Sequence, residues 1–261
     1  MIDKVIQDEL RAQYNPDGSS IRNIQLVSLE VLKEIDRICL KNDIKYILSS
    51  GTLLGAVRHR GFIPWDDDVD IEMLKEDYDK FLSVLDNDLS EDFVVHSYAN
   101  DPYFIHPFIK IREKKCEVFG THPISRKYNK RGCFVDVFPI QEISHISFII
   151  SRFLFRKLLW SPLRKYNLGL NYITCVRRVL IETIFPILTK LTSRSKKSYH
   201  HIMGSTFKKT RKLEYFTHIK RIKFENEYFN APEDSHGYLT DLYGNYMELP
   251  QAKQGHNLNI K

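Results

Sequence analysis

The chain has 261 residues, of which 43% are hydrophobic, so it can bury a full core and is expected to form one elaborated domain. Its net charge of +6 is uneven, because residues 151–223 carry 18 Lys and Arg against two acids, whereas the remainder carries 21 against 31. No secretory signal and no run of about 20 uncharged apolar residues is evident, which argues against secreted and membrane-spanning classes. The four cysteines form no Cys-x-x-Cys pair, so we expect free thiols in a reducing compartment and neither a zinc site nor a disulfide framework.

Hydrophobic periodicity predicts helices and strands that alternate along the first half of the chain. The predicted helices cover 21–42, 52–58 and 75–85, and the predicted strands cover 44–48, 67–73, 92–98, 106–112, 115–119 and 132–139. In the third helix, Tyr78, Phe81, Leu82 and Leu85 should face the core. The pattern indicates an α/β (α+β) fold with a small mixed sheet and flanking helices.

The stretch from Ser49 to Met73 opens with a small-residue turn and closes with a cluster of carboxylates. Strand alternation would put Asp68 and Asp70 on one face, where two neighbouring carboxylates repel each other and attract a divalent cation. Gly51 and Thr52 belong to a turn that could present backbone N–H groups and hydroxyls to a phosphate. Together these features predict a metal-assisted phosphoryl or nucleotidyl transfer site, although a lone Asp-x-Asp pair is more often a solvated loop or cap.

A third carboxylate is predicted in the strand Gly132–Pro139. Asp136 interrupts a buried apolar run, and a lone buried acid is costly unless it is paired or bound to metal. Asp136 is therefore our candidate for the third metal-binding carboxylate, against the alternative of an acid that caps a loop at a strand end.

The composition changes from 145 onward, where apolar segments are interspersed with basic residues. We expect the organisation 1–144 as catalytic core, 145–222 as a basic helical insertion and 223–261 as a C-terminal segment that packs on the core. Two interpretations of the insertion stay open, namely helices that pack on the core and helices that lie on an anionic membrane surface.

The sequence Gly-Thr-Leu-Leu-Gly-Ala-Val-Arg-His-Arg-Gly-Phe-Ile-Pro-Trp-Asp-Asp-Asp-Val-Asp-Ile, residues 51–71, closely resembles the signature of the LicD family. That family belongs to the nucleotidyltransferase-fold superfamily and includes bacterial phosphocholine transferases and relatives of fukutin. The segment Tyr-Leu-Thr-Asp-Leu-Tyr-Gly-Asn-Tyr-Met, residues 238–247, resembles the family's closing motif, with Asn245 in place of the usual Asp.

The resemblance implies a metal-dependent enzyme that moves phosphocholine, or another substituted phosphate, from a CDP-linked donor such as CDP-choline to a hydroxyl of a cell-surface glycan or glycolipid. Asp68, Asp70 and Asp136 would be catalytic and would hold Mg²⁺ or Mn²⁺. The acceptor would be lipopolysaccharide, capsule or teichoic acid. The enzyme would act in the cytoplasm, where nucleotide donors are available, or peripherally on the inner face of the cytoplasmic membrane.

Other residues of the motif are expected to bind substrate or to support the site. Gly51 and Thr52 would let the backbone approach the diphosphate, Arg58 would neutralise phosphate charge, and Trp65 would stack on a base or contact a quaternary ammonium. Trp65 could equally pack within its loop. His59 is predicted to be structural, and Asp66 and Asp67 are predicted to cap the loop or support the metal ligands.

Two further functions use the same sequence features. One is a nucleotidyltransferase that moves NMP to a protein, sugar or RNA, which would need the same three carboxylates. The other is a non-catalytic protein that binds membrane or nucleic acid through the insertion. We expect no nucleic-acid partner, because the insertion has no RNA-binding signature with stacked aromatic residues.

Overall fold

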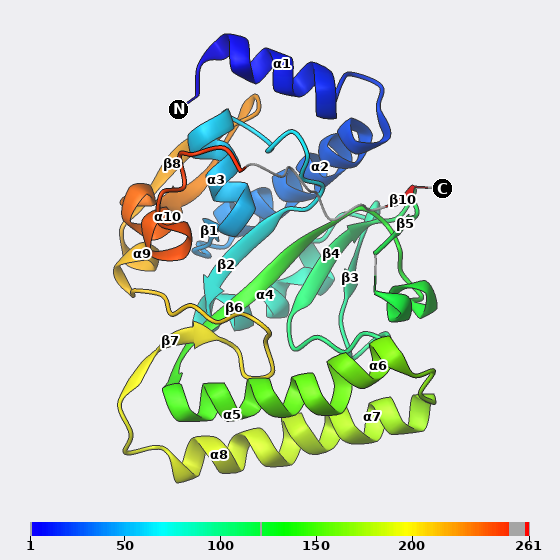
Figure 1. Ribbon diagram of the computed structural model, residues 1–261. Coiled ribbons are helices and arrows are strands. Elements are labelled where there is room, and N and C mark those ends of the chain that lie inside the picture. The colour runs from blue at the N-terminus through cyan, green and yellow to red at the C-terminus, as the bar shows by residue number, and fades with distance from the viewer. Residues whose placement is uncertain (1, 121, 251–258, 261) are drawn as a thin grey trace.

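The computed structural model describes residues 2–120, 122–250 and 259–260. Its centre is a mixed sheet in which β1, β2, β6, β4 and β3 lie side by side in that order, and β7 pairs with the far end of β6 (Figure 1). The strands are β1 (Ile47–Leu48), β2 (Asp70–Leu74), β3 (Phe93–His96), β4 (Ile109–Glu113), β6 (Phe134–Ser144) and β7 (Lys197–His201). Among the described strands of this sheet, β2 and β6 form the one parallel pair and the other pairs are antiparallel. The predicted α/β class with a mixed sheet and flanking helices is confirmed.

Helix α2 (Ser20–Lys41) contacts strands β4 and β6, and helix α4 (Lys75–Asp88) contacts strands β2 and β6. Both helices contribute apolar residues to the main core. The predicted helix at 21–42 is confirmed, and Ser19 caps its start by accepting a hydrogen bond from the Arg22 backbone N–H at 3.3 Å. Tyr78, Phe81 and Leu85 of α4 are buried as predicted, whereas the inward position predicted for Leu82 is wrong. Leu82 is 37% exposed, because α4 buries a narrower stripe than the sequence periodicity indicated.

Two strands next to the motif are shorter than the sequence predicts. The first begins at Ile47 instead of residue 44, and the carboxylate strand begins at Asp70 instead of residue 67. Asp68 therefore lies in the connection that follows α3 (Ser50–His59), and the strand alternation expected for Asp68 and Asp70 does not apply. Strand β1 ends at Leu48 because α3 begins at Ser50, so it pairs only with Ile71 and Glu72, and the register of β2 with β6 begins at Asp70.

The helical part of the insertion is two antiparallel arms at the bottom of the view in Figure 1. The first arm comprises α5 (His145–Phe155), the π-helical η2 (Arg156–Trp160) and α6 (Ser161–Lys165), and the second comprises α7 (Leu170–Arg178), the π-helical η3 (Val179–Ile184) and α8 (Phe185–Leu191). Their buried side chains form a second apolar cluster with Phe138 of β6 and Phe108, separate from the main core. Within the described part of the chain, no helix is both long and apolar enough to cross a bilayer.

The chain returns to the core after the insertion. α9 (Glu214–Thr217) leads to the hairpin β8 (Ile219–Phe224) and β9 (Glu227–Pro232), which is followed by α10 (Ser235–Tyr243). The boundary expected after residue 222 falls within β8, so the end of the insertion and the start of the tail share one hairpin. Smaller elements are α1 (Lys4–Tyr14), β5 (Val118–Phe119), the 3-10 helix η1 (Pro123–Lys127) and β10 (Asn259–Ile260), which pairs with β5.

Candidate functional site

Two carboxylates lie directly opposite each other on the neighbouring parallel strands β2 and β6. Asp70 is in register with Asp136, so the fold brings these two predicted site residues to adjacent positions in the sheet. Asp136 is in turn opposite Lys110 of β4, whose Nζ lies 2.6 Å from Asp136 Oδ1 and 2.8 Å from Asp136 Oδ2. The same ammonium group lies 3.5 Å from the centre of the Phe134 ring. Three adjacent strands thus bring two acids and one cation to a single position in the sheet.

The loop that precedes β2 adds further carboxylates to this position. One oxygen from each of Asp66, Asp67 and Asp68 lies within 4.8 Å of the others, which is close enough for a shared cation. The pKa of Asp70 is raised well above its ordinary value, first by burial and then by the negative charges of Asp68, Asp136 and Asp66. The charges of the loop residues Asp66 and Asp68 and of the strand residue Asp136 therefore all act on the carboxylate of Asp70.

The turn at the start of α3 holds the first residue of β2. The Thr52 hydroxyl oxygen accepts a hydrogen bond from the Asp70 backbone N–H at 2.8 Å, and the Ser49 backbone N–H donates to the Asp70 carbonyl at 3.0 Å. Ser50 has a left-handed backbone with φ 47°, a conformation that costs energy in a residue with a side chain and is concentrated at functional sites. A side chain at Gly51 would bring its Cβ to 2.8 Å from Asp66 Oδ2, so the Asp66 carboxylate would have to shift to admit it.

The tail motif reaches the same turn. Helix α10 packs against α3, and the pKa of Tyr243 is raised by burial and by the charge of Asp70, while a hydrogen bond with Ser50 opposes that rise. Tyr238 of the same helix is fully buried beside Glu72, and its pKa is raised by burial and by the Glu72 charge. The closing motif is therefore part of the wall of this site.

A buried ion pair supports β2 two residues beyond Asp70. Glu72 is 0% exposed, and Arg211 donates to its carboxylate through Nη2 at 2.6 Å and through Nε at 2.9 and 3.0 Å. His201 Nε2 lies 3.1 Å from Glu72 Oε1. Burial alone would raise the pKa of Glu72, but Arg211 and His201 lower it to about 2, so this carboxylate is charged at neutral pH.

The side chains of three other motif residues, Arg58, His59 and Trp65, are buried and contact other groups of the protein. Arg58 is 3% exposed and donates through Nη1 to the carbonyls of Tyr246 at 2.8 Å and Glu248 at 3.1 Å. His59 accepts from Arg58 Nε at 2.9 Å, and burial followed by the Arg58 charge lowers its pKa to about 3, as a structural histidine requires. Trp65 is 7% exposed and packs edge-on against His59 at 5.7 Å. The substrate roles of Arg58 and Trp65 stay predictions, and a change of conformation would be needed to free either side chain.

The donor set around Asp70 fits a hard divalent cation. The loop residues Asp66, Asp67 and Asp68 bring carboxylate oxygens within 4.8 Å of one another, and the charges of Asp66, Asp68 and Asp136 act on Asp70. Carboxylate oxygens are the ligand type that Mg²⁺ and Mn²⁺ prefer, and a bound cation would relieve their mutual repulsion. Neither histidine nor cysteine of the described chain belongs to this group of ligands, so a zinc-type site does not fit.

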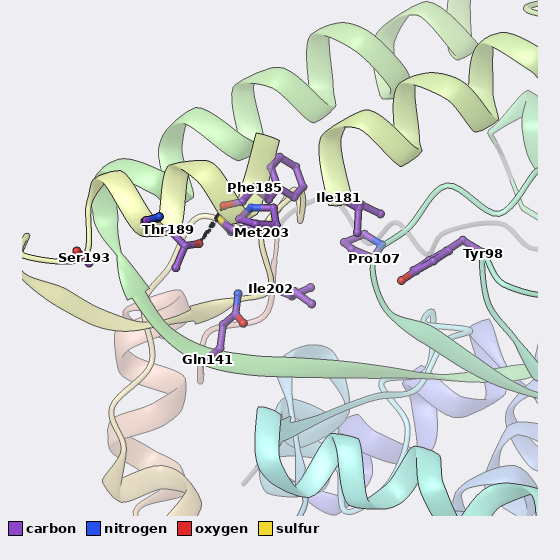
Figure 2. Close-up of a pocket in the computed structure, with 11 residues that line it drawn as sticks. Tyr98, Pro107, Gln141, Ile181, Phe185, Thr189, Ser193, Ile202 and Met203 are labelled. Carbon is purple, nitrogen blue, oxygen red and sulfur yellow. Dashed lines mark hydrogen bonds between the residues drawn. The ribbon is translucent and has the colours of Figure 1, made fainter. Parts of the chain in front are cut away.

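A large cavity lies away from these carboxylates (Figure 2). It has a volume of about 510 Å³ and lies between α8 and the far ends of β6 and β7. Its lining is mainly apolar, with Phe185 and Met203 at its centre and Gln141 on β6. Gln141 is five residues from Asp136, or about 16 Å along the strand. This cavity is therefore separate from the carboxylates.

The sequence analysis missed Lys110 and the Glu72–Arg211 pair. Lys110 interrupts an apolar strand just as Asp136 does, and that alternation was the signal that could have identified it. The partner of Glu72 is 139 residues away in the sequence, and no local pattern connects the two.

Comparison with known proteins agrees with the resemblance stated above. Residues 43–167 match the family model described as "LicD/FKTN/FKRP, nucleotidyltransferase domain". The chain is 28% identical over 251 residues to the lipopolysaccharide cholinephosphotransferase LicD of Haemophilus influenzae, covering 88% of this chain and 92% of that protein. It is also 32% identical over 133 residues to an uncharacterized protein of Rickettsia prowazekii, covering 44% of this chain and 48% of that one. The predicted resemblance to the LicD family is confirmed.

Proposed function

From this resemblance to the LicD family we propose that the protein is a metal-dependent transferase that moves phosphocholine, or another substituted phosphate, from a CDP-linked donor to a hydroxyl of a cell-surface glycan. The glycan would be lipopolysaccharide, the substrate named for the Haemophilus influenzae relative, or else capsule or teichoic acid. The observation that carries the proposal is the register of Asp70 with Asp136 beside the loop carboxylates and the strained turn at Ser50.

The carboxylates would hold the metal. Asp68, Asp70 and Asp136 are the proposed ligands, and the proximity of Asp66 to Asp68 adds a fourth candidate. A bound Mg²⁺ or Mn²⁺ would supply charge neutralisation to the diphosphate of the donor. Burial and the neighbouring carboxylates raise the pKa of Asp70, and a bound cation would oppose that rise by favouring the charged carboxylate.

The residues of the chain would position the two reactants. The acceptor hydroxyl oxygen forms a bond to the phosphorus that carries the choline, and the bond from that phosphorus to the bridging oxygen breaks, so that CMP leaves with its electron pair. Asp136 would either complete the metal site or accept the hydroxyl proton, and Lys110 would fix the position of its oxygens in both roles. The Lys110 ammonium group and the backbone N–H groups at the start of α3 would bind phosphate oxygens.

A donor screen tests the proposal. The purified full-length protein is mixed with Mg²⁺, a glycan acceptor and each of several CDP-alcohols, of which CDP-choline is the first, and the release of CMP is measured. We expect CMP only when donor, acceptor and metal are all present, and Asp136→Asn should abolish it. If no CDP-alcohol yields CMP above the Asp136→Asn control, the proposed reaction is wrong.

The same assay distinguishes the nucleotidyltransferase alternative. That reaction would consume a nucleoside triphosphate, release pyrophosphate and attach NMP to the acceptor. Pyrophosphate release with an NTP, together with no CMP release from any CDP-alcohol, would replace the proposed function with this one.

A further inference from the structure

The helical insertion has a higher density of exposed large hydrophobic residues than the rest of the described chain. Of the 20 large hydrophobic residues that are exposed among the described residues, 11 lie between residues 146 and 191. They are Ile146, Ile149, Ile150, Phe153, Leu158, Tyr166, Leu170, Tyr172, Val179, Ile187 and Leu191. Scattered exposed apolar residues are normal, but such a concentration in one structural unit marks an interaction surface.

Helix α5 carries a continuous part of this surface. Ile146, Ile149, Ile150 and Phe153 are spaced i, i+3, i+4 and i+7, so they form one stripe along the helix, and they are 52%, 43%, 37% and 58% exposed. The opposite side of α5 is already buried in the second apolar cluster and against α8, where the Ser147 hydroxyl donates to the Leu188 carbonyl at 3.1 Å. The helix thus has two apolar faces, of which the protein itself covers only one.

Positive charge surrounds the stripe. Residues 145–197 contain 11 Lys and Arg and a single acid, Glu182, which is bonded to Arg178 at 2.9 Å. Exposed cations occur next to the stripe, at Arg156 and Lys157, and along the second arm at Lys190. A surface with this surplus is complementary to a layer of anionic headgroups, to which each nearby Lys or Arg contributes about 1 kcal/mol of attraction.

We propose that the α5–α8 arms dock in the plane of an anionic lipid bilayer, with the Ile146–Phe153 stripe in the boundary between headgroups and acyl chains and the surrounding cations on the lipid phosphates. Apolar residues on one face with Lys and Arg at its borders are the features of an interfacial helix, and neither arm is apolar enough to span the bilayer. A second copy of the chain fits this surface less well, because it would bring two surfaces of the same strong positive charge together. The inference does not depend on which group the enzyme transfers.

Vesicle sedimentation tests the docking surface. The full-length protein is incubated with vesicles of phosphatidylcholine alone or mixed with phosphatidylglycerol, at low and at high salt, and the pelleted fraction is measured. We expect binding to the anionic vesicles that weakens with salt, because screening reduces the contribution of the Lys and Arg residues. The double variant Ile149→Ser/Phe153→Ser should bind about tenfold more weakly or worse, since two side chains that enter the bilayer are removed.

The matched control changes the same kind of residue in another part of the protein. Leu26 and Leu40 of α2 are 43% and 62% exposed, so Leu26→Ser/Leu40→Ser has the same chemistry on a helix outside the insertion. This control should bind like the wild type, and both double variants should keep the wild-type circular dichroism, because all four side chains are exposed. The proposal is overturned if the wild type does not pellet with anionic vesicles or if the two double variants lose binding equally. It is also overturned if the stripe variant only converts a dimer to a monomer.

Discussion

Replacing Arg211 by methionine should lower the free energy of unfolding by about 3–5 kcal/mol, because it leaves a buried carboxylate without its cation. Arg211 is 5% exposed and Glu72 is 0% exposed, and three hydrogen bonds of 2.6 to 3.0 Å join them. Neither solvent nor a surface cation can replace the lost charge at that depth. For a chain of this size each kcal/mol corresponds to about 2–4 °C in the midpoint of thermal unfolding, so the variant should melt about 6–20 °C below the wild type.

The assay is thermal unfolding at neutral pH followed by circular dichroism, with Arg178→Met as the matched control. Arg178 forms a similarly short bond to Glu182, at 2.9 Å, but the two side chains are 76% and 61% exposed. An exposed pair of this kind contributes about 0–1 kcal/mol, so the control should melt within a few degrees of the wild type. The double variant Glu72→Met/Arg211→Met should be more stable than Arg211→Met, because it removes the isolated charge. Equal losses in Arg211→Met and Arg178→Met, or a double variant that melts below Arg211→Met, would refute the reasoning.

Three further predictions concern the carboxylate site and one distant acid. Asp70→Asn should abolish CMP release while leaving the melting temperature equal or higher, since it relieves repulsion from neighbouring carboxylates, and Mg²⁺ should stabilise the wild type but not the variant. Lys110→Met should lower kcat by about tenfold to a hundredfold, measured as CMP release, because it removes the cation 2.6 Å from Asp136, and Lys110→Arg should restore part of the loss. The pKa of Glu34 is lowered from an ordinary 4.5 to about 2, chiefly by its hydrogen bonds from Arg37. The charged Glu34 carboxylate therefore stabilises the folded state fully above about pH 4.5, and this contribution is lost as the pH falls toward 2. The difference in melting temperature between wild type and Glu34→Gln should therefore be constant from pH 7 to about pH 5 and then shrink, and a difference that grows on acidification would contradict this sign.

The sequence identified the parts of the site that depend on local pattern. Asp136 was found because an acid within an apolar strand needs a partner, and the structure places it opposite Asp70. The helix at 21–42 was predicted from its hydrophobic periodicity. In both cases the physical requirement acts over a few residues, so the sequence alone records it.

The remaining features depend on contacts between distant segments. Asp68 was expected on a strand, but β1 pairs over only two residues, and the length of a partner strand is not encoded beside Asp68. Arg58 was expected to face phosphate, yet its guanidinium group bonds to carbonyls of the tail 188 and 190 residues away. A positive charge inside a motif indicates that an anion or a carbonyl is needed, but only the fold determines which of the two is present.

The buried ion pair also changes how the basic segment should be understood. By composition, residues 145–222 form an insertion added to an acidic core. Arg211 belongs to that segment, yet it neutralises Glu72 on the same strand as Asp70, and β7 extends the central sheet by pairing with β6. The end of the segment therefore supports the site from within, while the two helical arms carry the surplus of cations and exposed apolar residues outside it. Deletion of residues 145–222 would remove Arg211 and strand β7 together, so we expect it to destabilise the sheet that carries Asp70 rather than to leave an independent catalytic core.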